Sequence, residues 1–260
     1  MILLDCETLA SAELSMGNIF DVSRDELYRL LTLANGVFED PDWRRNAEPS
    51  EIVAEKFMTT LGRRPVFDGV CWFHFTRVPP TMDFSGGILP PIDRLDDIWE
   101  LLFSMLPQGF KRSDWARFRE SMTTRSAHYA HLYRMKTATR GLAGPYGMLL
   151  KEIAFQPGRA DLHYFQTPEI IEDISICFRE DHGFDLQGEY VKRTMPCIVK
   201  FICKEPEEGA LKDALYYLYL SRERGGAKGI QAVCFDAGGK PIPNSDILKV
   251  EFPPPSGLGT

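Results

Sequence analysis

The chain has 260 residues, of which 44% are hydrophobic, 12% aromatic and 26% charged. This composition is typical of a folded globular protein and excludes collagen-like, disordered and coiled-coil chains. Thirty basic and thirty-seven acidic residues give a net charge of −7, which argues against a chain wrapped in nucleic acid or spread on an anionic membrane. The length suffices for one large domain or two small ones.

Six cysteines are dispersed along the chain without a CxxC pair or a regular spacing to histidine. A structural zinc ion needs clustered ligands, so we predict no zinc finger and no other metal site. Most of these cysteines have apolar neighbours, which is typical of buried free thiols. No signal peptide and no membrane-spanning segment are predicted, so we expect a cytoplasmic protein without a membrane partner.

Residues 1–64 are predicted to form an acidic helical subdomain or cap. Ser23 followed by Glu26 makes a capping-box pattern, and apolar residues then recur at helical spacing up to residue 37. A second helix is expected to begin at Ser50 and to end at Gly62, because glycine suits the left-handed conformation after a helix.

Residues 65–252 are predicted to form an α+β core, with a mixed or antiparallel sheet flanked by helices. Cys71–Thr76 reads as a mostly buried strand because aromatic and apolar residues dominate it. A later run, Tyr190–Lys204, also reads as extended, with Pro196 requiring an edge position or a break. Helices are expected over 93–106, 114–135, 168–183 and around 211–219, a terminal hairpin over 230–235 and 247–252, and a flexible tail over 253–260.

Residues 111–140 depart from the mean charge of the chain. Eight basic and two acidic residues give this segment a charge of +6, so the remainder carries −13. A solvated helix face is the ordinary explanation, yet arginines interleaved with aromatic residues also grip phosphates while stacking on bases. The charge equally suits a protein partner or a contact with the acidic N-terminal helices. The candidate nucleic-acid or acceptor-binding residues are Arg117, Arg125, Tyr129 and Arg134.

His74 is the polar residue that most needs an explanation, because it stands in the predicted buried strand. An imidazole left unpaired inside a protein is costly, so His74 must be hydrogen-bonded or functional. His74 and Thr76 are two residues apart and therefore share one face of the strand. A histidine held in the core by a hydroxyl partner is the ordinary explanation. A site for a sugar diol, with the Gly86–Gly87 loop close by, is the functional one.

The arrangement of His74, Thr76 and the Gly-Ile-Leu segment at 87–89 resembles the opening motif of the ADP-ribosyltransferase superfamily. The likeness is to the His-Tyr-Glu branch, which includes diphtheria-type toxins and poly-ADP-ribose polymerases, and it covers about residues 66–252. The resemblance implies that NAD is the substrate and that His74 hydrogen-bonds the adenosine ribose. It also implies a tyrosine stacked on nicotinamide and an NAD site that includes Thr76, Arg77 and Gly87.

The remaining family positions are sought further along the chain. Gly188-Glu189-Tyr190-Val191 resembles the glutamate-aromatic start of a late strand, which implies that Glu189 is the catalytic carboxylate. A carboxylate at a ribose hydroxyl favours a cationic, oxocarbenium-like sugar centre, although a glutamate at a strand edge is also common. Tyr146, in a glycine-rich loop 72 residues after His74, is the candidate for the stacked tyrosine. Tyr164 is its competitor.

Two functions follow from these patterns. The first is an NAD-dependent ADP-ribosyltransferase that modifies nucleic acid or a protein in a toxin or phage-defence setting. The second is a non-catalytic intracellular binding protein, such as an immunity or defence-associated partner, that uses segment 111–140. The first function requires His74, Tyr146 and Glu189 to converge on one cleft.

Overall fold

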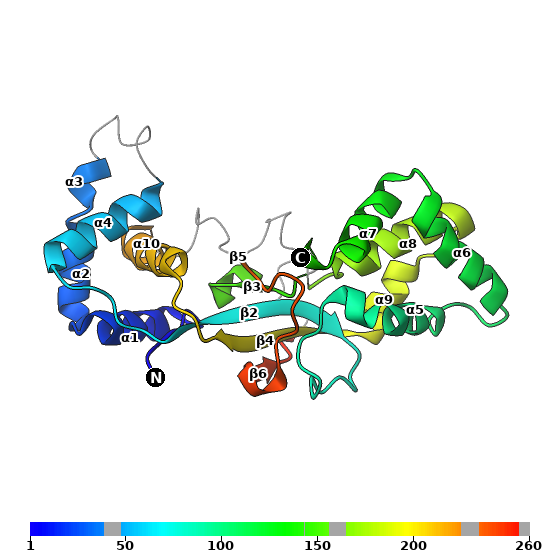
Figure 1. Cartoon of the computed structure of the whole chain (residues 1–260), viewed down its shortest axis with the longest axis horizontal. Coiled ribbons are helices and arrows are strands. Elements are labelled where there is room, and N and C mark those ends of the chain that lie inside the picture. The colour runs from blue at the N-terminus through cyan, green and yellow to red at the C-terminus, as the bar shows by residue number, and fades with distance from the viewer. Residues whose placement is uncertain (39–47, 143, 156–164, 225–233, 255–260) are drawn as a thin grey trace. The chain divides into compact units, whose positions relative to one another are not determined.

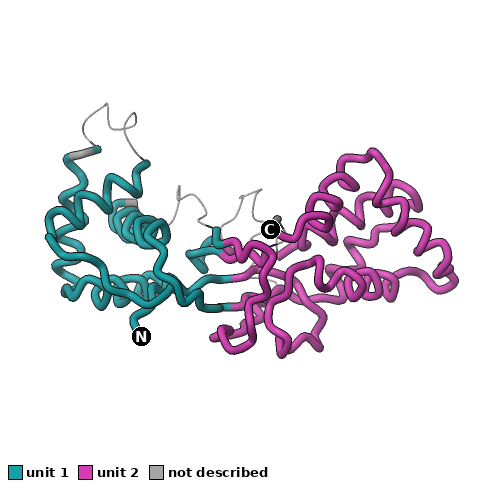
Figure 2. The backbone as a smooth tube through the Cα atoms, viewed as in Figure 1, with its two compact units in different colours: residues 1–73, 148–153, 200–235 teal, residues 74–147, 154–199, 236–260 magenta. Residues whose placement is uncertain are grey.

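A computed structural model describes residues 1–38, 48–142, 144–155, 165–224 and 234–254. The protein has the predicted α+β fold (Figure 1). Its chain divides into two compact units (Figure 2). Unit 1 comprises residues 1–73, 148–153 and 200–235, and unit 2 comprises residues 74–147, 154–199 and 236–260. This division differs from the predicted boundary at residue 64, because later segments of the chain belong to the same unit as the N-terminal helices.

The described residues form a six-stranded sheet with the strand order β5-β3-β2-β4-β6, and β1 pairs with β2. The β1–β2 pair is parallel, with Leu3 opposite Gly69. The β2–β3 pair is antiparallel, with Phe73 opposite Met148. The strands are β1 (Leu3–Leu4), β2 (Gly69–Val78), β3 (Tyr146–Met148), β4 (Met195–Cys203), β5 (Cys234–Asp236) and β6 (Ile247–Glu251).

The strand order corrects two predictions. Strands β5 and β6 stand at opposite ends of the order, so the predicted terminal hairpin is wrong. Its residues 230–233 lie outside the described residues. Strand β4 has β2 on one side and β6 on the other, so Pro196 is not in an edge strand. It is instead the second residue of β4, where the strand has only just begun and a missing N–H is tolerated.

Unit 1 contains five helices among its described residues. The N-terminal limit predicted at Ser23 is confirmed, because its Oγ accepts a hydrogen bond from the backbone N–H of Glu26 at 3.2 Å. The C-terminal limit at Gly62 is also confirmed, with φ +68°. The last helix packs against the first, second and fourth, which explains why the unit combines the N-terminal segment with residues 200–235. These helices are α1 (Leu9–Phe20), α2 (Arg24–Thr32), α3 (Asn35–Phe38), α4 (Pro49–Leu61) and α10 (Glu208–Arg224).

A half-buried ion-pair network joins distant segments of unit 1. The Nζ of Lys200, in β4, lies 2.6 Å from Oδ2 of Asp5 and 2.8 Å from Oε2 of Glu7. The other carboxylate oxygen of Glu7 lies 3.2 Å from Nζ of Lys151. Lys200 also lies 5.7 Å from the ring centroid of Phe73. The network therefore fastens the segment after β1 to β4 by side-chain contacts.

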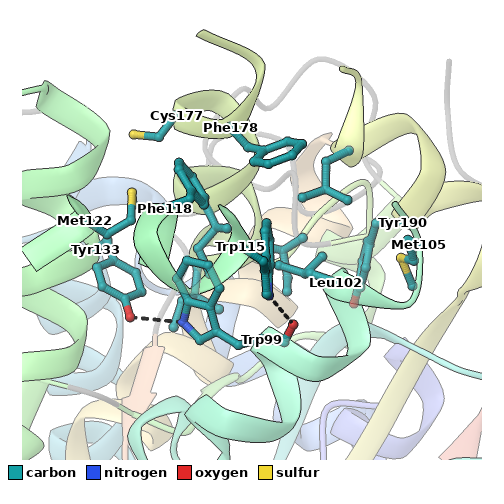
Figure 3. Packing of buried hydrophobic residues seen from close by; sticks show 14 of the residues in the cluster. Trp99, Leu102, Met105, Trp115, Phe118, Met122, Tyr133, Cys177, Phe178 and Tyr190 are labelled. Atoms are coloured by element: carbon teal, nitrogen blue, oxygen red, sulfur yellow. Dashed lines mark hydrogen bonds between the residues drawn. The ribbon is translucent and has the colours of Figure 1, made fainter. Parts of the chain in front are cut away.

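The helices of unit 2 share an aromatic core (Figure 3). Its centre is Trp99, whose indole N–H donates to the Tyr133 hydroxyl at 3.1 Å, while the Trp115 indole donates to the Trp99 carbonyl at 3.1 Å. The helix predicted over 114–135 is two helices, because the backbone is extended at Arg125. The elements are α5 (Leu95–Phe103), α6 (Arg112–Thr124), α7 (His128–Ala138), α8 (Glu169–His182) and α9 (Leu186–Arg193), with 3-10 turns η2 (Pro91–Arg94), η3 (Arg140–Leu142) and η5 (Asn244–Asp246). A further turn, η4, covers Lys151–Phe155.

The cysteines are free thiols, as predicted, and most of them are buried. Burial raises the pKa of the Cys197 thiol to about 12, so this group stays protonated at neutral pH. None of the helices in the described ranges is long and apolar enough to cross a lipid bilayer.

Candidate active site

His74 lies in β2, between the buried side chains of Phe73 and Phe75. Its Nδ1 lies 2.8 Å from the carbonyl oxygen of Tyr146. A carbonyl oxygen only accepts hydrogen bonds, so Nδ1 carries the proton and Nε2 of the neutral ring has a lone pair. Burial lowers the pKa of the imidazole, and the hydrogen bond to Tyr146 opposes that shift. At neutral pH His74 is therefore an uncharged hydrogen-bond acceptor with a fixed tautomer.

Tyr146 begins β3, and its side chain is 42% exposed. The structure brings it to His74 through its backbone carbonyl and not through its phenol ring. Gly144, two residues before Tyr146, has φ +62°. A Cβ at this glycine would come within 2.8 Å of the Tyr146 ring. The glycine therefore allows the ring to fold back over the chain. The competing Tyr164 lies outside the described residues.

Asp236 is an acidic residue on the strand beside that of Tyr146, and the sequence patterns did not single it out. It ends β5, the strand beside β3. The turn after it is hydrogen-bonded to the segment before Tyr146, from Ala237 N to Pro145 O at 3.1 Å and from Gly239 N to Gly144 O at 2.8 Å. Its Oδ1 accepts from the N–H of Gly238 at 2.8 Å. The Asp-Ala-Gly-Gly sequence signals this turn, but only the strand order shows that Asp236 ends the strand beside that of Tyr146.

Thr76 and Gly87 have different surroundings. Thr76 follows His74 by two residues in β2 and is half-buried, which agrees with a shared strand face. Gly87 has φ +83°, and a Cβ there would collide with the carbonyl oxygen of Ile242. Ile88 exchanges two backbone hydrogen bonds of 2.9 Å with Ile242. Gly87 is thus required for the close approach of two backbone segments.

The guanidinium of Arg77 makes four hydrogen bonds inside unit 2, which weighs against its predicted role in NAD binding. It donates to the carbonyl oxygens of Phe165 at 2.6 Å and of Val191 and Thr194 at 2.9 Å each. Its Nε donates to the Thr194 hydroxyl at 3.2 Å, and its own carbonyl accepts from the Tyr190 hydroxyl at 2.7 Å. Arg77 therefore holds the C-terminal end of α9 against β2.

The prediction that Glu189 begins a strand is wrong. Glu189 lies in the first turn of the helix α9. Asp185 caps this helix by accepting from the N–H of Gly188 at 3.1 Å. The Glu189 carboxylate lies 2.7 Å from Nζ of Lys192 and 3.5 Å from Nη2 of Arg193. The hydrogen bond from Lys192 lowers its pKa. Within the described residues, the structure gives this carboxylate no contact with His74 or Tyr146, so Glu189 does not join them in one site.

The positive charges of segment 111–140 are largely matched by carboxylates of α5 and α8. Arg125 lies 2.8 Å from Asp181 and 3.3 Å from Glu180, and Arg117 pairs with Asp114 on its own helix. Comparable pairs join Arg112 to Glu100 and Arg119 to Asp96. The acidic cover predicted from the N-terminal helices is thus supplied within unit 2.

Two other predicted nucleic-acid contacts have structural roles. Arg134 donates through Nη1 to the carbonyl oxygens of Met122 at 3.0 Å and Arg125 at 2.8 Å, so it caps the end of α6. Tyr129 is half-buried against the aromatic core, with its ring beside that of His128. Of the four predicted residues, Arg117 remains the most accessible, with a side chain 77% exposed.

A buried carboxylate in the same unit leads to a prediction about pH. Asp173, 3% exposed, lies 2.8 Å from Nζ of Lys136, which also pairs with Glu169. Burial raises the pKa of Asp173 from 3.8 to about 6, and Lys136 opposes the shift. The folded protein therefore holds this proton more tightly than the unfolded chain. The protonated Asp173 carboxyl therefore contributes its full stabilisation to the folded protein below about pH 4. This contribution is lost as the pH rises to about 6.

In urea denaturation, we expect Asp173→Asn to gain stability relative to the wild type as the pH is raised from 4 to 7. Between pH 4 and 7, the difference in free energy of unfolding between the variant and the wild type should change by an amount on the order of 2–3 kcal/mol. This amount corresponds to the raised pKa of Asp173. Glu120→Gln, at an exposed glutamate outside this group of ion pairs, is the control. A stability difference between Asp173→Asn and wild type that is constant from pH 4 to 7 would contradict the assignment.

Within the described residues, no group of three or more histidine, cysteine, aspartate or glutamate side chains is arranged to hold a metal ion. Comparison with protein families, with characterised proteins and with solved structures finds no match to this chain.

Proposed function

We propose that the protein is an NAD-dependent ADP-ribosyltransferase-like enzyme whose substrate site is built around His74 and Tyr146. The observation that carries the proposal is the 2.8 Å hydrogen bond between the His74 imidazole and the backbone carbonyl of Tyr146, 72 positions further along the chain. The family resemblance assigns the same two residues to the adenosine ribose and to nicotinamide. The non-catalytic alternative depends on segment 111–140, and the ion pairs of its arginines weigh against it.

The chemistry of His74 fits a ribose. A neutral imidazole whose Nδ1–H is engaged offers Nε2 as an acceptor for a sugar hydroxyl. Thr76, on the same strand, adds a hydroxyl that both donates and accepts. The exposed ring of Tyr146 offers a flat surface for nicotinamide. In the reaction, the bond between the ribose and nicotinamide breaks, and the acceptor bonds to the same sugar carbon.

Asp236 is our candidate for the carboxylate that the resemblance assigned to Glu189. It ends the strand beside that of Tyr146, and its exposed side chain keeps one oxygen beyond the hydrogen bond from Gly238. A negative charge near the reacting sugar stabilises the positive charge that develops on it. Glu189, by contrast, is neutralised by Lys192 and Arg193. The acceptor is proposed to be a nucleic acid or a protein, in a toxin or defence setting.

The test is nicotinamide release from NAD by the purified protein. We expect His74→Ala to lower the rate about tenfold, as for the loss of one substrate hydrogen bond, and Asp236→Asn to lower it about a hundredfold. Glu189→Gln and Arg117→Ala should leave the rate unchanged. Thermal melts confirm that each variant is folded.

Two results would count against the proposal. Wild-type protein that releases no nicotinamide, with or without nucleic-acid and protein acceptors, would exclude the enzyme. Activity that survives Asp236→Asn but not Glu189→Gln would return the catalytic role to Glu189.

A further inference from the structure

A groove of about 430 Å³ lies in unit 1, along α2 and the last turn of α10. Three arginines reach it, two from α2 and one from α10, and they surround an aromatic ring. Its size falls in the usual range for small-molecule sites, about 300–1,000 Å³. The lining residues are Arg24, Asp25, Tyr28, Arg29, Thr32 and Arg222.

Two of the lining side chains, Arg24 and Tyr28, are held by a buried carboxylate. Glu13, 8% exposed, accepts from Nε of Arg24 at 2.7 Å and from Nη2 at 2.9 Å, and the Tyr28 hydroxyl donates to the same carboxylate. This pairing leaves N–H groups of the Arg24 guanidinium directed elsewhere, since the group has five donors. Arg24 and Tyr28 are therefore fixed in place before any ligand arrives.

The other two arginines of the groove, Arg29 and Arg222, are not neutralised by a strong ion pair among the described residues. Arg29 is 3.7 Å from its nearest carboxylate, that of Glu26, and both side chains are largely exposed, so the pair is weak. Arg222 has no ion pair with any residue in the described ranges, and its guanidinium carbon lies 5.2 Å from the Tyr28 ring centroid. Two guanidinium groups from different helices thus line one groove without a strong carboxylate partner.

We propose that this groove binds a small sugar phosphate of nucleotide size. Arginine forks match the oxygens of phosphate, and Arg29 and Arg222 supply them here. Asp25, in the same groove, would repel a phosphate but accepts hydrogen bonds from sugar hydroxyls. This combination selects a phosphate ester of a sugar over free phosphate. The site is independent of the NAD-cleaving function proposed above and involves none of its residues.

The experiment is calorimetric titration of the full chain with ribose 5-phosphate, adenosine diphosphate and inorganic phosphate. We expect the two sugar phosphates to bind more tightly than inorganic phosphate. Arg222→Gln and Arg29→Gln should each weaken their binding about tenfold. Asp25→Asn should remove the preference over inorganic phosphate. Both arginines are exposed, so these variants should fold normally.

Arg117→Gln, at an exposed arginine outside both proposed sites, is the control and should bind the sugar phosphates as the wild type does. Binding that persists in Arg222→Gln but fails in His74→Ala would assign the ligand to the other site and overturn the proposal. Equal affinity for inorganic phosphate and sugar phosphates would overturn the sugar assignment. Failure of all three probes to bind at millimolar concentration would exclude the site.

Discussion

Replacing Trp99 with alanine is expected to lower the free energy of unfolding of unit 2 by about 3–5 kcal/mol, as is usual for a large aromatic residue removed from a core. Trp99 is 1% exposed and its ring lies 4.9 Å from that of Trp115. The substitution leaves a cavity and also removes the donor to the Tyr133 hydroxyl. Because the rings of α5, α6, α7 and α8 meet in one cluster, the loss should destabilise all four helices together.

Urea denaturation followed by tryptophan fluorescence and circular dichroism measures this effect. Tyr133→Phe removes the hydroxyl but keeps the ring, so it isolates the hydrogen bond and should cost about 1 kcal/mol. The exposed Arg117→Ala is the control, with an expected change within about 0.5 kcal/mol. If Trp99→Ala were as stable as Arg117→Ala, the aromatic cluster would not be the core of unit 2.

Arg77→Met should destabilise unit 2 by about 3 kcal/mol or more, although methionine has a similar length. The substitution leaves the carbonyl oxygens of Phe165, Val191 and Thr194 without their charged donor. Hydrogen bonds to charged groups are worth about 1.5–3 kcal/mol each, and buried carbonyls left unpaired add to the loss. The C-terminal end of α9 should be the first part to loosen.

Thermal melts and hydrogen exchange of α9 test this prediction, with Arg77→Lys as the matched variant. Lysine keeps the charge but lacks the fork that reaches three carbonyls, so it should recover only part of the stability. Under the function proposed above, a folded Arg77→Lys protein should keep the wild-type KM for NAD. A raised KM with normal stability would instead return Arg77 to the NAD site.

Local signals in the sequence predicted helix ends well but did not predict every element. The Ser23 cap and the Gly62 stop act within a few residues, so their patterns were sufficient. The sequence pattern predicts a strand where α9 lies, because Tyr190 and Val191 favour strands. The cap at Asp185, which accepts from Gly188, is the local signal that overrides them.

Contacts between distant residues could not be predicted from local patterns. A buried histidine needs a partner, and that argument was sound for His74, but the partner is a backbone carbonyl 72 residues away. Arg77 followed a plausible motif, yet its partners lie 88 to 117 residues further along the chain. The prediction of a terminal hairpin is also wrong because it rests on local patterns, whereas the order of the strands depends on the whole sheet.

The ion pairs of Lys200 with Asp5 and Glu7 span 195 and 193 residues. Protein synthesis proceeds from the N-terminus, so these two carboxylates leave the ribosome long before their partner. By then the helices from α5 to α9 have all emerged and can assemble their aromatic core. Unit 1 can only be completed when β4 and α10 arrive. The part of the protein that is made first is therefore among the last to be finished.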